Sequence, residues 1–196
     1  MFTDIPDTIL ETMRELERRD EVDRDNDTSR LERLRQITPD TGQFIALWAA
    51  AAPKGSMIEI GTSAGYSALW LSLACRATGR TLTTFEILPA KVRLATETFT
   101  RTGVGDVVTL VEADFLAHVD DFEEIAFCFL DAEKDVYEAC FDAVVPKMVP
   151  GGILIADNAT SHRDELRTML DRALADKRVD AMVATVSKGE LICRKR

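Results

Sequence analysis

From Met57 to the C-terminus, short apolar runs alternate with helical segments, and this alternation constrains the fold more than any other feature. Such alternation is typical of βαβ units, which build a mostly parallel sheet with helices on both faces. The predicted strands are Met57–Ile60, Thr81–Phe85, Val107–Val111, Ala126–Leu130, Ile153–Ala156, Met182–Val186 and Leu191–Cys193. The predicted helices are Ser67–Ala77, Pro89–Thr102, Lys134–Val145 and Arg163–Ala175, and Pro150-Gly-Gly152 is expected to turn the chain into a strand. Because Ser187-Lys-Gly189 is a short turn, we expect a C-terminal antiparallel hairpin strand in a seven-stranded α/β sheet.

The first 52 residues have a different character and are expected to be helical. One helix is indicated by apolar residues at helical spacing, Ile5, Ile9, Leu10, Met13 and Leu16, with Thr3 or Asp4 as its cap. The polar stretch Asp20–Asp27 is expected to be a solvated loop. A second helix, Thr41–Ala52, is expected to bury Phe44, Ile45, Leu47 and Trp48. We therefore expect one domain over residues 1–196, with a helical segment at 1–52 and the α/β core at 53–196.

Composition excludes several classes of protein. The net charge of −10 argues against non-specific nucleic-acid binding, which depends on Lys and Arg neutralising phosphates. The four cysteines form no CxxC pair and lie in apolar runs, which is typical of core thiols in a reducing compartment. The longest apolar runs are too short to span a bilayer, and the N-terminus has no signal-peptide pattern. The sequence thus predicts a cytoplasmic protein without nucleic-acid or membrane partners.

The first three predicted strands end in residues suited to a nucleoside. The first continues into Glu59-Ile-Gly-Thr-Ser-Ala-Gly-Tyr-Ser67, where Gly61 and Gly65 permit a tight turn and close backbone approach to a ligand. The GxxxG spacing lacks the dinucleotide fingerprint GxGxxG, and no phosphate-binding GK[ST] follows. Glu86 and Asp114 follow the next two strands, and in a doubly wound sheet these strand ends meet in one crevice. There Glu86 would accept the hydroxyls of a ribose and Asp114 would face an adenine, although Glu86 could equally cap the next helix.

Carboxylates follow the fourth and fifth strands. Asp131 ends one strand, and Asp157-Asn158 ends the next, so all three side chains are expected to converge as oxygen ligands for Mg²⁺, Ca²⁺ or Mn²⁺. Each aspartate could instead cap the helix that follows it. Lys134 lies three residues after Asp131 and is either a surface lysine or a general base beside the metal.

Taken together, these motifs resemble the class I, divalent-metal-dependent O-methyltransferases that include catechol and caffeoyl-CoA O-methyltransferases. The resemblance is carried by Glu59–Ser67, Glu86, Asp131–Tyr137, Pro150–Gly152 and Asp157-Asn158, and it extends upstream to Ile37–Gln43. It implies a Rossmann-like fold that binds S-adenosylmethionine (SAM). It also implies transfer of the SAM methyl group to a hydroxyl of a small, catechol-like acceptor, with Asp131, Asp157 and Asn158 binding the metal and Lys134 and Asp131 as catalytic residues. The residues implied in SAM binding are Ile37, Glu59, Gly61, Thr62, Ser63, Gly65, Tyr66, Ser67, Glu86, Ile87, Ala113, Asp114 and Asp131.

Two departures from that family leave the acceptor and the mechanism open. A helix is expected soon after Asn158, where relatives usually have a longer loop, and the N-terminal region is short. One alternative is a metal-independent SAM methyltransferase with Lys134 or His162 as base, although His162 could be only a polar residue at a helix start. Others are a non-catalytic SAM-binding protein and, less favoured without GxGxxG, a nicotinamide-dependent reductase. As in many relatives, the N-terminal helix could pack against a second subunit, which predicts a homodimer.

Overall fold

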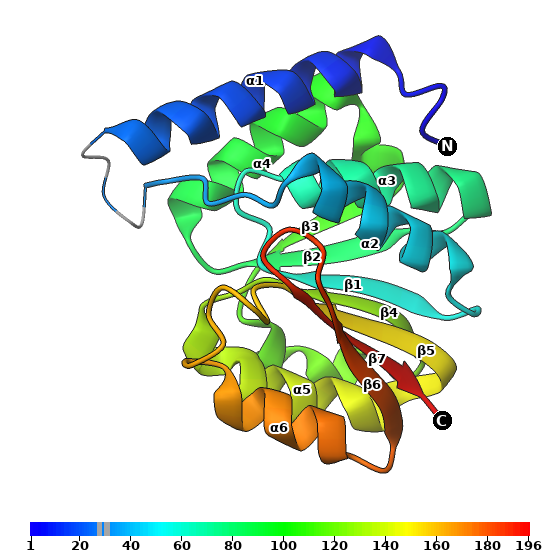
Figure 1. The fold of residues 1–196 in the computed structure, drawn as a ribbon. Coiled ribbons are helices and arrows are strands. Elements are labelled where there is room, and N and C mark those ends of the chain that lie inside the picture. The colour runs from blue at the N-terminus through cyan, green and yellow to red at the C-terminus, as the bar shows by residue number, and fades with distance from the viewer. Residues whose placement is uncertain (27–28, 30–31) are drawn as a thin grey trace.

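The computed structural model describes residues 1–26, 29 and 32–196, and these residues contain a central seven-stranded sheet (Figure 1). The strand order is β3-β2-β1-β4-β5-β7-β6. β7 is antiparallel to both of its neighbours, whereas the other neighbouring strands pair in parallel. The strands are β1 Ser56–Ile60, β2 Leu82–Glu86, β3 Val108–Glu112, β4 Ile125–Leu130, β5 Met148–Ala156, β6 Val179–Ala184 and β7 Glu190–Lys195. The predicted α/β sheet with a C-terminal antiparallel hairpin strand is confirmed.

Helices cover both faces of the sheet, as expected for a Rossmann-like fold (Figure 1). One face carries α1 Asp7–Asp25, α2 Pro39–Ala51, α3 Tyr66–Thr78 and α4 Pro89–Thr102, and the other carries α5 Tyr137–Lys147 and α6 Arg167–Ala175. Short 3-10 helices lie at Val104–Asp106, Phe115–Ala117, Val119–Asp121 and Lys134–Val136. Among the helices of the described chain, none combines the length and apolar character needed to cross a bilayer.

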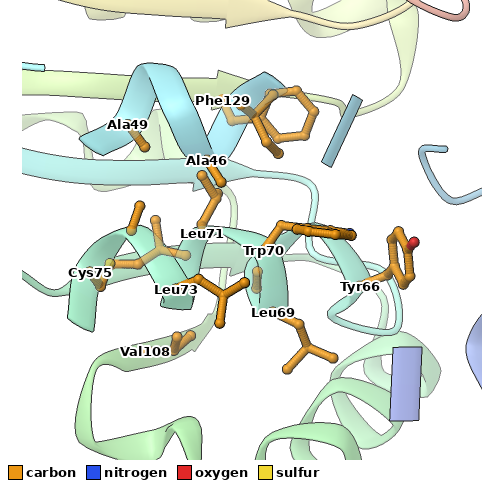
Figure 2. Packing of buried hydrophobic residues seen from close by; sticks show 14 of the residues in the cluster. Ala46, Ala49, Tyr66, Leu69, Trp70, Leu71, Leu73, Cys75, Val108 and Phe129 are labelled. Carbon is orange, nitrogen blue, oxygen red and sulfur yellow. The ribbon is translucent and has the colours of Figure 1, made fainter. Parts of the chain in front are cut away.

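The helix that follows the first strand, α3, lies at the centre of one of these layers. Every residue from Tyr66 to Cys75 is buried, which is typical of a helix that is apolar on all sides. Figure 2 shows Leu71 directed toward Ala46 of α2, and Trp70 between that helix and Tyr66. Because α3 is packed on all sides, the loop that precedes it is held firmly at the end of β1.

Close packing of α2 on α3 makes Gly42 a sensitive position. A Cβ atom at Gly42 would lie 2.3 Å from the Trp70 ring. We expect Gly42→Ala to lower the free energy of unfolding by about 2 kcal/mol, since overpacking forces a buried ring out of its rotamer. Urea unfolding followed by circular dichroism measures this. Gly105→Ala is the matched control, because a Cβ there meets nothing within 4 Å. Equal stability of the two variants would contradict the packing argument.

Several expectations for the N-terminal segment are wrong. The stretch predicted as a solvated loop is helical to Asp25, and Asp20 and Asp23 are buried; Asp27 lies outside the described residues. These two acids accept hydrogen bonds from backbone amides further along the chain, so their burial is compensated. Neither Thr3 nor Asp4 caps α1, which begins after Pro6 without a side-chain cap. In α2, Leu47 is exposed rather than buried.

The C-terminal half also differs in detail. Pro150–Gly152 lies inside β5 rather than in a turn before it, because the β4–β5 pairing shifts register there and Gly151 has a φ of +79°. The helix expected from Arg163 begins at Arg167, since residues 157–166 form consecutive turns. β6 begins at Val179, three residues before the predicted start. The loop that follows Asn158 is therefore longer than the sequence indicated.

Backbone hydrogen bonds align the carboxyl ends of the central strands. Asp131 N donates to Ile60 O (2.9 Å), and Asp157 N donates to Leu130 O (3.1 Å). On the other side, Gly61 N donates to Phe85 O (3.0 Å). Residues that leave β1, β2, β4 and β5 are thereby brought to one edge, where ligands bind in open α/β sheets.

Candidate active site

A cavity of about 740 Å³ lies at this edge, large enough for a nucleoside-sized ligand together with a small second molecule. Its wall includes residues that follow β1, β2, β3 and β4, together with Leu34–Ile37 and with Asn158, His162 and Lys188. Its lining contains both acidic and basic side chains, so it is not of one charge.

The cavity brings together most of the residues selected from the sequence. Those in its wall are Ile37, Gly61, Thr62, Ser63, Tyr66, Ser67, Glu86, Ile87, Ala113, Asp114, Asp131, Lys134, Asn158 and His162. Three predicted residues, Glu59, Gly65 and Asp157, do not line it. A Cβ atom at Gly65 would lie 2.6 Å from the Phe99 ring, and Gly65 has a φ of +88°. Glycine at this position is therefore required by packing and backbone conformation rather than by close approach of a ligand.

Glu86 organises the loops around it. Its Oε2 accepts Ser63 N at 2.8 Å, and its Oε1 accepts Ile87 N and Leu88 N at 2.9 and 3.0 Å. The carboxylate thus ties the loop after β1 to the turn after β2. Two carboxylate oxygens offer about four acceptor positions, so one remains for a ligand hydroxyl.

Glu59 lies behind the cavity wall and is fully buried. Its Oε2 accepts Thr84 Oγ1 at 2.5 Å, and its Oε1 has no partner within the described residues. Burial raises the pKa of this carboxyl to about 7, against the opposing hydrogen bonds from Ser67 and Thr84. The folded chain therefore holds a proton there that the unfolded chain has lost near neutral pH.

This difference predicts a pH-dependent effect of Glu59→Gln. Because the pKa is raised on folding from 4.5 to about 7, Glu59 makes the wild type progressively less stable as the pH rises through that window. Glutamine carries no charge at either pH, so the variant does not lose this stability. We expect the free energy of unfolding of the variant to exceed that of wild type by about 2 kcal/mol at pH 8 and by little at pH 5. Urea unfolding at both pH values measures this, with exposed Glu123→Gln as control. The same difference at both pH values would refute the assignment.

Asp131 and Lys134, which line the cavity, form a compact polar cluster with the buried Tyr137. Lys134 Nζ donates to Asp131 Oδ1 (3.2 Å), Ala132 O (3.1 Å) and the Tyr137 hydroxyl (2.6 Å). The same ammonium lies 4.4 Å from the centre of the Tyr137 ring, which adds a cation–π contact. Lys134 is only 11% exposed at its side chain, so the expectation of an ordinary surface lysine is wrong.

Two further acidic side chains, Asp157 and Glu190, are buried beside this cluster. Burial and the neighbouring Asp157 raise the pKa of Asp131 to about 7. Asp157 Oδ1 accepts the backbone amide of Asn158 at 2.6 Å. Glu190 on β7, which the sequence did not single out, accepts Thr41 Oγ1 at 3.1 Å, and burial together with Asp157 raises its pKa to about 10. Crowded carboxylates of this kind are relieved either by protons or by a cation.

The predicted metal ligands are two carboxylates and one side-chain amide, rather than three acidic side chains. Among the described residues, no three His, Cys, Asp or Glu side chains are placed to hold a metal together. Asp131 and Asn158 line the cavity, whereas Asp157 lies directly behind it. Two carboxylates and an amide oxygen are hard donors, so the chemistry of the set fits Mg²⁺, Ca²⁺ or Mn²⁺. His162 also lines the cavity, with its Nδ1 3.0 Å from Ser161 Oγ.

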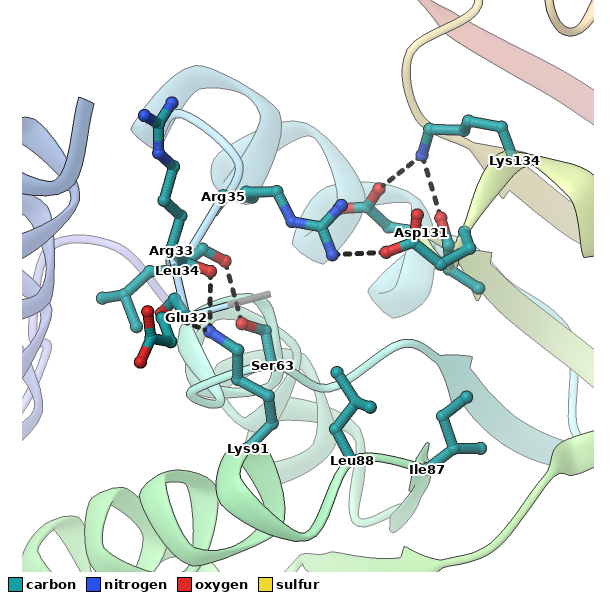
Figure 3. Close-up of polar contacts among 12 residues, drawn as sticks. Glu32, Arg33, Leu34, Arg35, Ser63, Ile87, Leu88, Lys91, Asp131 and Lys134 are labelled. Atoms are coloured by element: carbon teal, nitrogen blue, oxygen red, sulfur yellow. Dashed lines mark hydrogen bonds and ion pairs between the residues drawn. The ribbon is translucent and has the colours of Figure 1, made fainter. Parts of the chain in front are cut away.

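The segment of residues 32–37 contributes to the cavity in ways that the sequence did not indicate. Lys91 is 3% exposed, and its ammonium donates to Glu32 O (3.0 Å) and Arg33 O (2.6 Å) (Figure 3). Ser63 Oγ donates to Leu34 O at 2.9 Å, and Arg35 pairs with Glu133 at 2.5 Å. A lysine early in an amphipathic helix is a common exposed residue, so no local pattern distinguishes Lys91 as an anchor.

Comparison with known proteins gives consistent matches along the chain. The sequence model of the O-methyltransferase family matches residues 11–196. A catechol O-methyltransferase of Niastella koreensis is 28% identical over 127 residues, which are 62% of this chain and 57% of that protein. A putative caffeoyl-CoA O-methyltransferase of Arabidopsis thaliana is 27% identical over 181 residues, covering 82% of this chain and 78% of that protein.

Solved structures share the same fold. The O-methyltransferase of Bacillus cereus, in complex with S-adenosylhomocysteine (SAH), superposes with a TM-score of 0.76 at 22% identity, covering 95% of this chain and 91% of that one. A SAH-bound methyltransferase of Podospora anserina gives a TM-score of 0.78 at 24% identity, covering 98% and 89%. These matches confirm the Rossmann-like fold. With the family match over nearly the whole sequence, they lead to one conclusion: this chain belongs to the O-methyltransferase family.

Proposed function

We propose that this chain transfers a methyl group from SAM to a hydroxyl of a small acceptor with two vicinal oxygens, such as a catechol, with the help of a divalent cation. The observation that carries the proposal is that Asp131 and Lys134, bonded to each other and to the buried Tyr137, line a cavity large enough for both molecules. Relatives named as catechol and caffeoyl-CoA O-methyltransferases support the choice of acceptor.

The cofactor is proposed to lie along the strand ends. Glu86 would receive a ribose hydroxyl at its remaining acceptor position, and Asp114, with Ala113 and Ile87, would lie around the adenine. Gly61, Thr62, Ser63, Tyr66 and Ser67 would surround the methionine portion. These residues all line the same cavity, which supports the arrangement. SAM supplies an electrophilic methyl group on its sulfonium.

The divalent cation is proposed to be held by Asp131, Asp157 and Asn158. When bound, such a cation lowers the pKa of a coordinated hydroxyl and orients it. The raised pKa of Asp131, caused by burial and by the neighbouring Asp157, is what a bound cation would counteract.

Lys134 is proposed to act as a neutral amine that accepts the proton of the acceptor hydroxyl and thereby becomes the ammonium that donates to Asp131, Ala132 and Tyr137. Hydrogen bonds to Asp131 and Tyr137 hold the Lys134 side chain in one conformation, so its nitrogen is positioned at the cavity wall.

A metal-independent methyltransferase is the second candidate function. It is favoured by the position of His162, which lines the same cavity as Lys134 and gives the site two nitrogen bases. In that case the acceptor needs only one hydroxyl.

Turnover with a chelator distinguishes these candidates. The protein is incubated with SAM and a panel of catechols, vicinal diols and simple phenols, with Mg²⁺ or with EDTA, and methylated products are measured by mass spectrometry. We expect products from catechols or diols and a loss of at least about tenfold with EDTA. Equal turnover with EDTA would favour the metal-independent enzyme. No product from any acceptor, despite SAH binding, would favour a non-catalytic SAM-binding protein.

For partners, we propose a small-molecule acceptor and a second copy of this chain, with no nucleic acid or membrane, in the cytoplasm. Within the single chain, α1 buries Ile9 and Met13, whereas Val22 of the same helix is exposed. Gel filtration with light scattering measures the oligomeric state.

A further inference from the structure

The side-chain amide of Gln36 is a buried polar group in the cavity wall. Gln36 is 7% exposed, and it belongs to the cavity wall. Its Oε1 has no hydrogen-bond donor within the described chain. The other three buried side-chain atoms without partners there belong to Glu59, Trp70 and Glu190, none of which lines the cavity. A buried carbonyl oxygen without a donor has lost its hydration without compensation, so the chain is stabilised when a ligand in the cavity supplies the donor.

The backbone that carries Gln36 is fixed from several sides. Gln36 N donates to Asp20 Oδ1 (3.3 Å), and Leu34 N donates to Asp23 Oδ2 (3.1 Å). Both acids belong to α1, so the side chains of this helix hold the backbone of the segment that carries Gln36. With the anchors from Lys91 and Ser63, these bonds hold the 32–37 segment in one position before any ligand arrives.

Three cations of the cavity wall, Arg24, Arg35 and Lys91, have partners other than the Gln36 amide. Arg24 pairs with Asp20, and Arg35 pairs with Glu133. Lys91 is occupied by the carbonyls of residues 32 and 33, as Figure 3 shows. The donor for Gln36 Oε1 must therefore come from a bound molecule.

SAM carries three kinds of hydrogen-bond donor: the adenine amino group, the ribose hydroxyls and the α-ammonium. On the proposed function, Asp114 serves the first and Glu86 the second. Glu59, the acid expected near the methionine portion, lies behind the wall. The α-ammonium therefore remains as the donor for Gln36 Oε1, and the 32–37 segment contacts the loops after β1 and β4 through Ser63 and Glu133.

We propose that Gln36 binds the cofactor by accepting a hydrogen bond from its α-ammonium group through Oε1. This assignment rests on the proposed use of SAM. It adds to the site a residue that precedes the sequence motifs, and it gives α1 and Lys91 the role of positioning that residue.

Calorimetric titration with two ligands tests the proposal. SAH contains the α-ammonium, whereas 5′-methylthioadenosine has the same adenosine without the amino-acid part. We expect Gln36→Met to weaken SAH binding about tenfold, as for the loss of one hydrogen bond to a charged group, and to leave methylthioadenosine binding within about twofold. Gln36→Glu keeps an acceptor oxygen and is expected to bind SAH at least as tightly as wild type.

Three outcomes would overturn the assignment: unchanged SAH affinity in Gln36→Met, equal weakening of both ligands, or Gln36→Glu as weak as Gln36→Met. Equal weakening would mean that Gln36 only holds the segment in place. If the wild-type protein binds neither ligand, the proposed function itself is refuted. The wild-type titration therefore distinguishes failure of the proposed function from failure of the Gln36 assignment.

Discussion

Replacing Lys134 by methionine is expected to reduce kcat at least about 100-fold, since removal of a general base typically costs that much or more. The affinity for SAH is expected to stay unchanged, because the ammonium is bound by Asp131, Ala132 and Tyr137 rather than by the residues proposed for the cofactor. Steady-state kinetics with the acceptor found by screening, together with calorimetry for SAH, measures both quantities.

A second variant separates the two roles that Lys134 could have. Lys134→Arg keeps the positive charge beside Asp131 but cannot give up a proton near neutral pH. If Lys134 is the base, the arginine variant is as inactive as the methionine variant. Recovery of activity by arginine would show that only the charge matters, and full activity of Lys134→Met would exclude both roles. Lys147→Met, at a surface pair with Asp120, is the control for loss of a lysine elsewhere.

Gly61→Ala is expected to have the largest effect on the fold of the site. A Cβ atom there would lie 2.3 Å from the backbone oxygen of Asp131, and Gly61 has a φ of +102°. The β1 and β4 strand ends would have to separate, which displaces Asp131. We expect a loss of at least about 3 kcal/mol in the free energy of unfolding, as for other substitutions that combine strain with a backbone collision, and no measurable SAH binding.

Gly103→Ala is the matched control for this variant. Gly103 also has a positive φ, +64°, but a Cβ there meets nothing within 4 Å. Its cost is therefore only the left-handed backbone, about 1 kcal/mol. Denaturant unfolding of both variants and calorimetry for SAH give the comparison. Equal losses in the two proteins would contradict the view that contact with Asp131 makes Gly61 necessary.

The sheet could be predicted from the sequence because its strands are short apolar runs bounded by turn residues. The same patterns placed Gly61, Glu86, Asp131 and Asn158 at one edge, since parallel strands align their carboxyl ends. Strand boundaries near β5 and β6 were less accurate. Pro150 and Gly151 read as a turn, yet a register shift accommodates them inside a strand.

The N-terminal contribution to the cavity could not be predicted, for a physical reason. Asp20 and Asp23 look like solvent-exposed acids, because their partners are backbone amides of residues 34 and 36, which no sequence pattern marks. Lys91 also looks solvent-exposed in the sequence, because its partners are backbone carbonyls and not a carboxylate. Glu190 follows a hairpin turn and is buried only because β7 lies between β5 and β6.

The most direct test of the account is a calorimetric titration of Mg²⁺ into metal-stripped protein saturated with SAH. We predict saturable binding at one site in the wild type, at least about tenfold weaker binding in Asp157→Asn, where an amide oxygen replaces a charged ligand, and unchanged binding in Asp135→Asn, an exposed acid of the same cavity outside the proposed ligand set. SAH affinity should be the same in all three proteins. Absence of Mg²⁺ binding by the wild type with catechol also present, or undiminished binding by Asp157→Asn, would contradict a metal site formed by Asp131, Asp157 and Asn158.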